Sequence, residues 1–283
     1  MTGQSWFGRV GWRHVVAILA CFFALFPILF VTSAALNPLG TLSSSTLIPS
    51  GASLINFEAL FGRTDFVNWF INSIVVAGFA TVFSLALSTF AAYAFSRFRF
   101  AGRRPGLLFL LIIQMFPQFL AIVTIYIMFT TISDLYPPIG FNTSWSLILL
   151  YMGGALGVNT WLMKGFFDTV PAELDESAKV DGASHTTTFF RIILPLVTPI
   201  LAVVGVLSFI SAINEFLFAS VFLTQSQSKT LAVGLYGLVA GERNANFGVF
   251  AAGTLLTAIP TVLLFFSLQK YIAGGLTAGA VKG

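Results

Sequence analysis

Charged residues are scarce in this sequence: Asp, Glu, Lys and Arg make up 8% of its 283 residues. Soluble domains carry about 25% charged residues, so a chain of this length with so few charges cannot cover a water-facing surface. That excludes an ordinary soluble globular protein. Hydrophobic residues make up 57% of the chain and include 32 Phe. The composition therefore indicates a protein whose main solvent is the lipid bilayer.

Residues for metal, disulfide or nucleophilic chemistry are equally few. The single cysteine, Cys21, cannot form an internal disulfide or a cysteine metal site, and the two histidines, His14 and His185, lie in different segments. The sequence contains no Gly-x4-Gly-Lys-Ser/Thr motif for binding nucleotide phosphates. Basic residues are dispersed, so no stripe of them favours nucleic acid. The sequence predicts a chain that is not an enzyme by itself and holds no metal or cofactor.

Long apolar stretches fill most of the chain. A membrane-spanning helix needs about 20 consecutive apolar residues. Six stretches meet that need, at approximately 15–36, 69–95, 107–131, 144–163, 195–222 and 248–270. The sequence thus predicts an all-α membrane protein with six transmembrane helices in one domain, 1–283.

Lys and Arg are distributed unevenly over the connections between these stretches. Eleven lie in the N-terminal segment, in the second-to-third and fourth-to-fifth connections and after the sixth stretch, whereas Arg63, Lys229 and Arg243 lie in the others. Cytoplasmic loops carry the excess of Lys and Arg in membrane proteins. We therefore expect both termini in the cytoplasm of a bacterial or archaeal cell, with the protein in the inner membrane.

The connection from Lys164 to Arg191 differs from the rest of the chain, because it holds five of the ten acidic residues. Pro171 suits the first turn of a helix, acidic residues follow near the positive end of the helix dipole, and Gly182 stands where a helix would stop. A helix of about eleven residues here is too short and too charged to span a membrane. We expect it to lie on the cytoplasmic side, followed by a second helical piece from about Ser184.

This segment resembles a known family. Glu176-Ser177-Ala178, Gly182 and Ile192-Ile193-Leu194-Pro195 have the spacing of the EAA loop of ABC importer permeases. Ser177 departs from the pattern but keeps a small side chain. The resemblance implies the type I ABC importer permease fold, with a short coupling helix between spans 4 and 5 that docks on the ATPase. It assigns this coupling to Glu176, Ser177, Ala178, Gly182 and Ala183.

The similarity extends to the smaller of the two paired maltose/maltodextrin permeases, over most of residues 80–283. The segments Ala92–Phe95, Gln114–Pro117, Ile139–Thr143 and Thr230–Gly234 resemble that subgroup. So does the C-terminal tail, which in that subgroup reaches between the two ATPase subunits: Gly275, Leu276, Thr277, Ala278, Gly279, Ala280, Val281, Lys282 and Gly283. The resemblance also implies a loop that contacts the external binding protein, here Leu235, Tyr236, Gly237, Gly241, Glu242, Arg243 and Asn244.

The resemblance implies a sugar importer, with maltose, maltodextrin or a related oligosaccharide such as trehalose as cargo. Its expected partners are a second permease subunit, two ATPase subunits that bind ATP and Mg, and an extracytoplasmic sugar-binding protein. Transport would proceed by alternating access, with closure of the ATPase dimer favouring the outward-open state. In this subgroup most sugar contacts come from the partner permease, so the sequence leaves open whether this chain touches cargo.

The sequence leaves alternative functions possible and does not settle the role of one residue, Glu215. The chain could carry another solute delivered by a binding protein, or be an ion-coupled secondary transporter, which usually buries acids or broken helices near the midplane. A non-transporting assembly subunit is a third alternative. Glu215 is the one acid inside an apolar stretch; it is a candidate gate or a wet residue near the outer interface.

Overall fold

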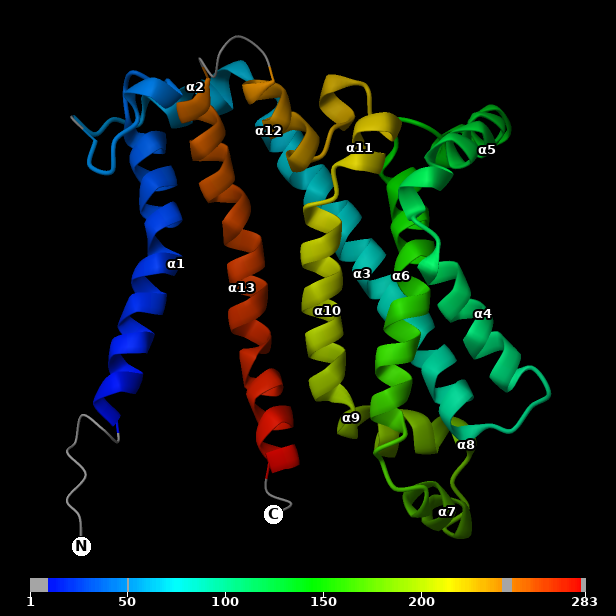
Figure 1. The fold of residues 1–283 in the computed structure, drawn as a ribbon. Helices are drawn as coiled ribbons and strands as arrows, with labels where there is room; N and C mark the ends of the chain where they lie inside the picture. Colours follow the sequence, from blue (N-terminus) through cyan, green and yellow to red (C-terminus); the bar gives the residue numbers. More distant parts are fainter. Residues whose placement is uncertain (1–9, 50, 241–245, 281–283) are drawn as a thin grey trace, which may run out of the picture. The chain divides into compact units, whose positions relative to one another are not determined.

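The computed structural model describes residues 10–49, 51–240 and 246–280, with side chains described up to Tyr271. These residues form helices joined by turns, with no strand among them (Figure 1). The chain divides into two compact units, each described by itself. Unit 1 combines Met1–Phe66 with Gly234–Ala258, and unit 2 combines Val67–Val233 with Ile259–Gly283.

Five helical segments of the described chain are long and apolar enough to cross a membrane. They are α1 (Trp12–Leu36), α3 (Phe66–Arg97), Gln118–Leu135, α6 (Ser144–Phe167) and the Phe247–Tyr271 part of α13 (Phe247–Ala280). The pair His185–Leu196 and Thr198–Ile213, bent by 74°, makes a sixth if it counts as one span. The predicted all-α membrane fold is confirmed.

The third expected stretch, 107–131, is not one helix in the structure. Helix α4 (Arg103–Met115) ends before Pro117, and Phe116 takes an extended backbone (ψ 125°). The chain then continues through the 3₁₀ turn η3 (Gln118–Ala121) into α5 (Ile122–Leu135), which turns away from α4 (Figure 1). Proline supplies no N–H and disfavours helical backbone at the preceding residue, so it breaks the helix here.

The fifth expected stretch is also interrupted. Three short helical pieces lead into it: α8 (His185–Thr187), the π-helical segment η5 (Thr188–Ile193) and α9 (Leu194–Leu196). The stretch then continues as two separate helices, α10 (Thr198–Ile213) and α11 (Leu217–Phe222). The side chain of Ser184 accepts the backbone N–H of Thr187 at 3.2 Å and so caps α8. The helical piece expected from about Ser184 is confirmed.

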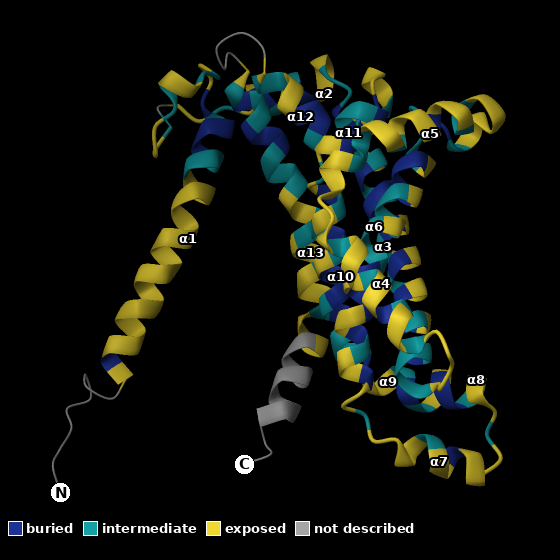
Figure 2. Cartoon of the chain, turned by 45° about the vertical axis from the view of Figure 1, so that its right-hand side comes forward, coloured by how far each residue is buried: buried dark blue, intermediate teal, exposed yellow. Residues whose placement is uncertain are grey.

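Unit 1 contains α1, the 3₁₀ turn η2 (Leu42–Ser44), α2 (Ile55–Arg63) and the adjoining parts of α12 (Leu231–Val239) and α13. The buried amide of Asn56 donates to the carbonyls of Ala35 (2.9 Å) and Asn37 (2.8 Å), which ties α2 to the end of α1. A Cβ at Gly248 would lie 2.6 Å from the Asn56 amide nitrogen, so α13 approaches α2 closely there. Most of α1 remains exposed within this chain (Figure 2).

The two larger apolar clusters of unit 2 involve α3, α5, α6, α10 and α11, and α4 packs against α6 beside them. Unit 2 also holds η4 (Pro137–Ile139), α7 (Glu173–Val180) and η6 (Ser226–Ser228). One cluster joins α6 to α11 around Leu147, Ile148 and Phe222, all at most 1% exposed. The other joins α3, α6 and η5 around Met163 and Phe167, both fully buried. Helix α7 projects from the end of unit 2 at which this second cluster lies, and that end is called the α7 end below.

Asn142 fixes the connection after α11, at the opposite end of unit 2. It is the only non-glycine residue with positive φ (59°) in the described chain. Its side-chain oxygen accepts the backbone N–H groups of Thr224 (2.8 Å) and Gln225 (2.9 Å), and its own N–H donates to Phe222 O at 2.9 Å. Asparagine tolerates left-handed backbone and supplies this acceptor.

Replacing Asn142 with leucine is expected to destabilise the protein by about 1–3 kcal/mol, because leucine strains the left-handed backbone and removes the acceptor. Asn142→Gly should cost less, since it keeps the backbone conformation. Asn142→Asp should cost least, since it keeps both features. Thermal unfolding of the three purified variants tests the order; equal losses in all three would contradict this role.

Candidate functional site

Helix α7 occupies the segment in which the sequence predicts a coupling helix. It runs over eight residues, Glu173–Val180, with three acids in its first turn. The expected eleven-residue helix is thus shorter, because Pro171 and Ala172 form a preceding turn that accepts the N–H groups of Leu174, Asp175 and Glu176. Acids at the N-terminus favour the helix through its dipole.

Gly182 ends α7 as the sequence predicts. Its φ is +79°, its N–H donates to Lys179 O at 3.0 Å, and the N–H of Ala183 donates to Ala178 O at 2.9 Å. This is the Schellman arrangement, in which a left-handed residue closes the last helical turn. A Cβ at Gly182 would meet nothing within 4 Å. The requirement for glycine is therefore one of backbone conformation, not of space.

Asp175 attaches α7 to the end of α3. Its Oδ2 lies 3.0 Å from Arg97 Nε, with 12% of the arginine side chain and 16% of the aspartate side chain exposed. Tyr93 donates to Asp175 Oδ1 at 3.3 Å, and Arg97 also donates to Val170 O at 2.8 Å. An ion pair largely shielded from solvent and one hydrogen bond thus link the short helix α7 directly to the long apolar helix α3.

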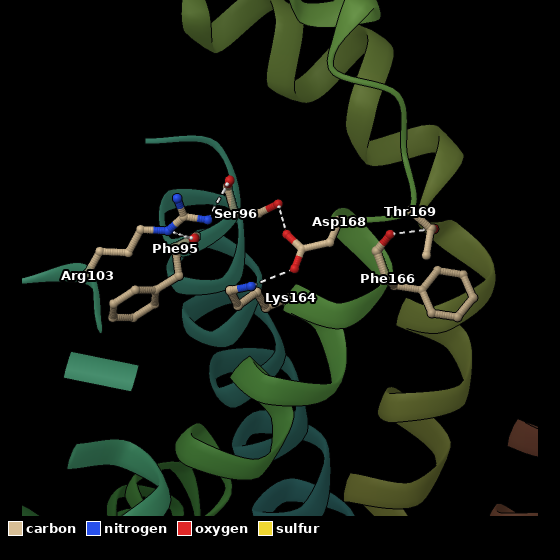
Figure 3. A network of polar contacts seen from close by, with 7 residues as sticks. All are labelled: Phe95, Ser96, Arg103, Lys164, Phe166, Asp168 and Thr169. Carbon is tan, nitrogen blue, oxygen red and sulfur yellow. Dashed lines mark hydrogen bonds and ion pairs between the residues drawn. The ribbon is translucent and has the colours of Figure 1, made fainter. Parts of the chain in front are cut away.

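A second polar network links the ends of α3, α4 and α6 beside it (Figure 3). Asp168 accepts from Ser96 Oγ at 2.6 Å and from Lys164 Nζ at 2.5 Å. Arg103 donates to the carbonyls of Phe95 (2.6 Å) and Ser96 (3.2 Å). These bonds join the last turn of α3, the end of α6 and the first residue of α4 beside the α7 segment.

The charge state of Asp168 follows from this network. Burial raises the pKa of its carboxyl group, but hydrogen bonds from Lys164 and Ser96 and the charges of Lys164 and Arg103 outweigh burial and leave the pKa below its ordinary value of 3.8. A lowered pKa means that the carboxylate stabilises the fold at neutral pH. That contribution is lost only as the pH falls through the lowered value.

The remaining coupling residues are divided between an exposed and a buried face. Glu176, Ser177 and Gly182 are exposed, whereas Ala178 is 4% exposed and faces the rest of the chain. Val180 is 88% exposed, which is unusual for an apolar side chain on a polar helix. The structure therefore presents Glu176, Ser177 and Val180 outward and uses Ala178 for internal packing.

Sequence reasoning missed the anchoring residues. Arg97, Asp175 and Asp168 entered it only as charges, and Tyr93 only as part of a similar segment. The excess of arginine after α3 and of acid after α6 signals that these two connections attract each other. It does not say which of several arginines meets which of five acids.

Glu215 has a structural role in the described chain. Its carboxylate accepts the backbone N–H groups of Phe218 (2.9 Å) and Ala219 (3.0 Å) in the first turn of α11, and Tyr151 Oη donates to it at 2.5 Å. Three donors therefore occupy the one acid of this apolar region. Its predicted role as a gate stays a prediction.

The other two groups of predicted contacts are only partly described. Leu235 is 6% exposed and packs within this chain on the apolar helix α12, and its expected contact with the binding protein stays a prediction. Tyr236 is 54% exposed. Gly241, Glu242, Arg243 and Asn244 lie outside the described residues, as do Val281, Lys282 and Gly283; the backbone of Gly275–Ala280 continues α13.

Comparison with known proteins gives concordant matches. Residues 84–277 match the family described as binding-protein-dependent transport system inner membrane component. The chain is 42% identical over 278 residues to the galactooligosaccharides transport system permease protein GanQ of Bacillus subtilis, covering 97% of this chain and 96% of that protein. It is 40% identical over 260 residues to the maltodextrin transport system permease protein MdxG of the same organism, covering 92% and 91%.

A solved structure has the same fold. The chain matches a subunit of a bacterial ABC transporter involved in the import of the acidic polysaccharide alginate, with a TM-score of 0.77. The match covers 96% of this chain and 99% of that one at 20% sequence identity. The family match over residues 84–277 contains the whole α7 segment and its anchoring residues.

Proposed function

Since this chain belongs to the family of binding-protein-dependent transport system inner membrane components, we propose that it is the permease subunit of an ABC importer that carries a neutral oligosaccharide. The curated relatives are named for galactooligosaccharides and maltodextrin, which supports an oligosaccharide as cargo. Maltose, maltodextrin and galactooligosaccharide are the first candidates. The chain itself performs no catalysis.

One observation carries the mechanism: α7 projects from the end of unit 2 and is held to α3 by the Arg97–Asp175 pair. We propose that the exposed side of α7 docks on an ATPase subunit. ATP and Mg bind to two such subunits, and a second permease completes the path through the membrane. A binding protein delivers the cargo, and its contact with the complex favours the outward-open state by differential binding.

The proposed orientation places the α7 end in the cytoplasm, together with both termini. The basic residues of the connections that meet there support it, because Lys and Arg accumulate on the cytoplasmic side. These residues of unit 2 are Arg97, Arg99, Arg103, Arg104, Lys164, Lys179 and Arg191.

Cysteine labelling tests this orientation. In a Cys21→Ser background, Ser43→Cys should react with a membrane-impermeant thiol reagent added to intact cells, whereas Thr186→Cys should react only after the cells are opened. Both positions are exposed in the structure, so accessibility of the side chain is matched. Labelling of Thr186→Cys in intact cells would contradict the orientation.

Reconstitution tests the function. The complete complex in proteoliposomes, with its binding protein outside and ATP inside, is expected to take up maltotriose or galactobiose. A matched complex whose ATPase subunits cannot hydrolyse ATP should show none. Uptake that continues without ATP hydrolysis and follows an imposed ion gradient would instead favour the secondary-transporter alternative.

A further inference from the structure

A cavity of about 1040 Å³ lies inside unit 2, between α4, α5, α6, α10 and the turn before α11. Cavities of roughly this size, mostly apolar with a few converging polar groups, are typical of small-molecule sites. Its walls are mainly aliphatic and aromatic side chains, among them Ile125, Leu162 and Phe218. The polar groups in these walls show what the cavity can bind.

Glycines on α6 bring two glutamines to the edge of the cavity. A Cβ at Gly157 would lie 2.5 Å from Gln114 Nε2, and one at Gly154 would lie 3.3 Å from Gln118 Nε2. Gln114 Nε2 donates to Gly154 O at 3.1 Å, which fixes its amide against α6. The absence of side chains on α6 therefore makes room for amide groups from α4 and η3, and both line the cavity.

Several hydrogen-bond donors and acceptors in these walls have no partner within the described chain. The side chains of Gln118 and Ser211 have no hydrogen-bond partner among the described residues, and both line the cavity. Asn159 is 7% exposed; its amide nitrogen donates to Ser208 Oγ at 3.1 Å, and no described group pairs with its carbonyl oxygen. An amide offers two donors and two acceptor lone pairs, so these residues present both kinds of group.

The one acid of the cavity already accepts hydrogen bonds from this chain. Glu215 is the only ionisable acid among its lining residues, and Tyr151 and two backbone N–H groups of α11 occupy its carboxylate. No Lys or Arg lines the cavity. Three donors already hold the Glu215 carboxylate and leave it little capacity to coordinate a cation, and an anion would find no positive charge. A neutral ligand with several hydroxyl groups matches donors and acceptors set in apolar walls.

We propose that this cavity is a cargo subsite within this chain, which binds a neutral sugar ring through Gln118, Asn159 and Ser211. The proposal rests on the proposed function and deepens it, because it places cargo contacts in this subunit as well as in its partner. Glu215 and Tyr151 act as positioning residues that hold the start of α11 against the site. The apolar walls pack on the faces of the ring.

The first test uses the complete complex with its binding protein. Gln118→Leu should lower maltotriose uptake about fivefold, the loss expected for one or two neutral hydrogen bonds. Because Gln118 has no partner in the described chain, its loss leaves no buried group unpaired. ATP hydrolysis stimulated by the loaded binding protein should persist. Gln269→Leu, on the exposed part of α13 outside the cavity, is the matched control and should transport normally.

A steric variant provides a second arm. Gly153 lines the cavity, and a Cβ there would meet nothing within 4 Å, so Gly153→Phe should fill the space without disturbing α6. Gly165→Phe, at another open position on the same helix, is its control. Uptake should be lost in the first variant alone, with stimulated hydrolysis retained in both. Normal uptake in both Gly153→Phe and Gln118→Leu would overturn the proposal.

A binding readout independent of uptake completes the test. In a Cys21→Ser background, maltotriose should slow N-ethylmaleimide labelling of Ser211→Cys in the nucleotide-free complex, whereas an anionic alginate trisaccharide should not. A cysteine that is unreactive with or without sugar would show that the partner permease or lipid fills the cavity, and would overturn the subsite. Loss of ATP-driven uptake and of stimulated hydrolysis in the unmodified complex would refute the proposed function instead.

Discussion

Replacing Arg97 with leucine is expected to cost about 3 kcal/mol of stability at the α7 end and to abolish coupled transport. Removal of one member of a buried ion pair leaves the other charge uncompensated, and both side chains of the Arg97–Asp175 pair are less than one-fifth exposed. Without the pair, α7 keeps only the 3.3 Å hydrogen bond from Tyr93 as its connection to α3. Movement of the docked ATPase would then reach that helix poorly.

A double-mutant cycle separates coupling from general destabilisation. Asp175→Leu alone should be as harmful as Arg97→Leu, but the double variant should be more stable than the sum of the single losses predicts, because it buries no unpaired charge. Its transport should remain low, since the link is still absent. Arg99→Leu, at an exposed neighbouring arginine, is the control. Additive losses, or full transport by Arg97→Leu, would contradict the role of the pair.

Replacing Gly182 with valine is expected to have the second large effect. The positive φ of Gly182 costs a residue with a Cβ about 1–2 kcal/mol, and β-branched valine more than most. The open space around the position means that the loss comes from the backbone alone. The last turn of α7 should therefore open, and ATP-driven uptake should fall about tenfold, as a loss near 1.4 kcal/mol in the docked state implies.

The series at Gly182 has an internal control. Gly182→Asn should retain most activity, because asparagine adopts left-handed backbone more readily than valine. Gly165→Val should also be mild, since that glycine has an ordinary helical backbone and open surroundings. The measurement is uptake together with the amount of ATPase that co-purifies. Equal losses for valine and asparagine would indicate that size, not backbone conformation, matters at Gly182.

The sequence predicts the helices well because uncharged stretches of about 20 residues have few alternatives in a bilayer. It also predicts the end of α7, since a glycine after a polar helix is the usual terminator. The division of the third stretch at Pro117 was not predicted. Proline is tolerated inside membrane helices when neighbours satisfy the freed groups, and that depends on packing.

The anchoring of the site depends on contacts between distant segments. Arg97 and Asp175 are 78 positions apart; four arginines lie between the end of α3 and the start of α4, and five acids follow α6. The charge pattern of the sequence therefore predicts that the two connections attract each other, but it does not predict which arginine pairs with which acid. The same holds for Glu215, whose partner Tyr151 lies 64 positions earlier. An isolated intramembrane acid was interpreted as a gate or a surface residue, and the structure shows it as a helix cap.

Photo-crosslinking at Val180 tests the central claim, docking of α7 on an ATPase, most directly. A photoreactive residue at Val180, which is 88% exposed, should give a covalent product with the ATPase subunit in cells that express the complete transporter. The same residue at Ile48, which is 82% exposed, should give none. A complex that retains its ATPase but yields no product from Val180, or an equal product from Ile48, would contradict the account.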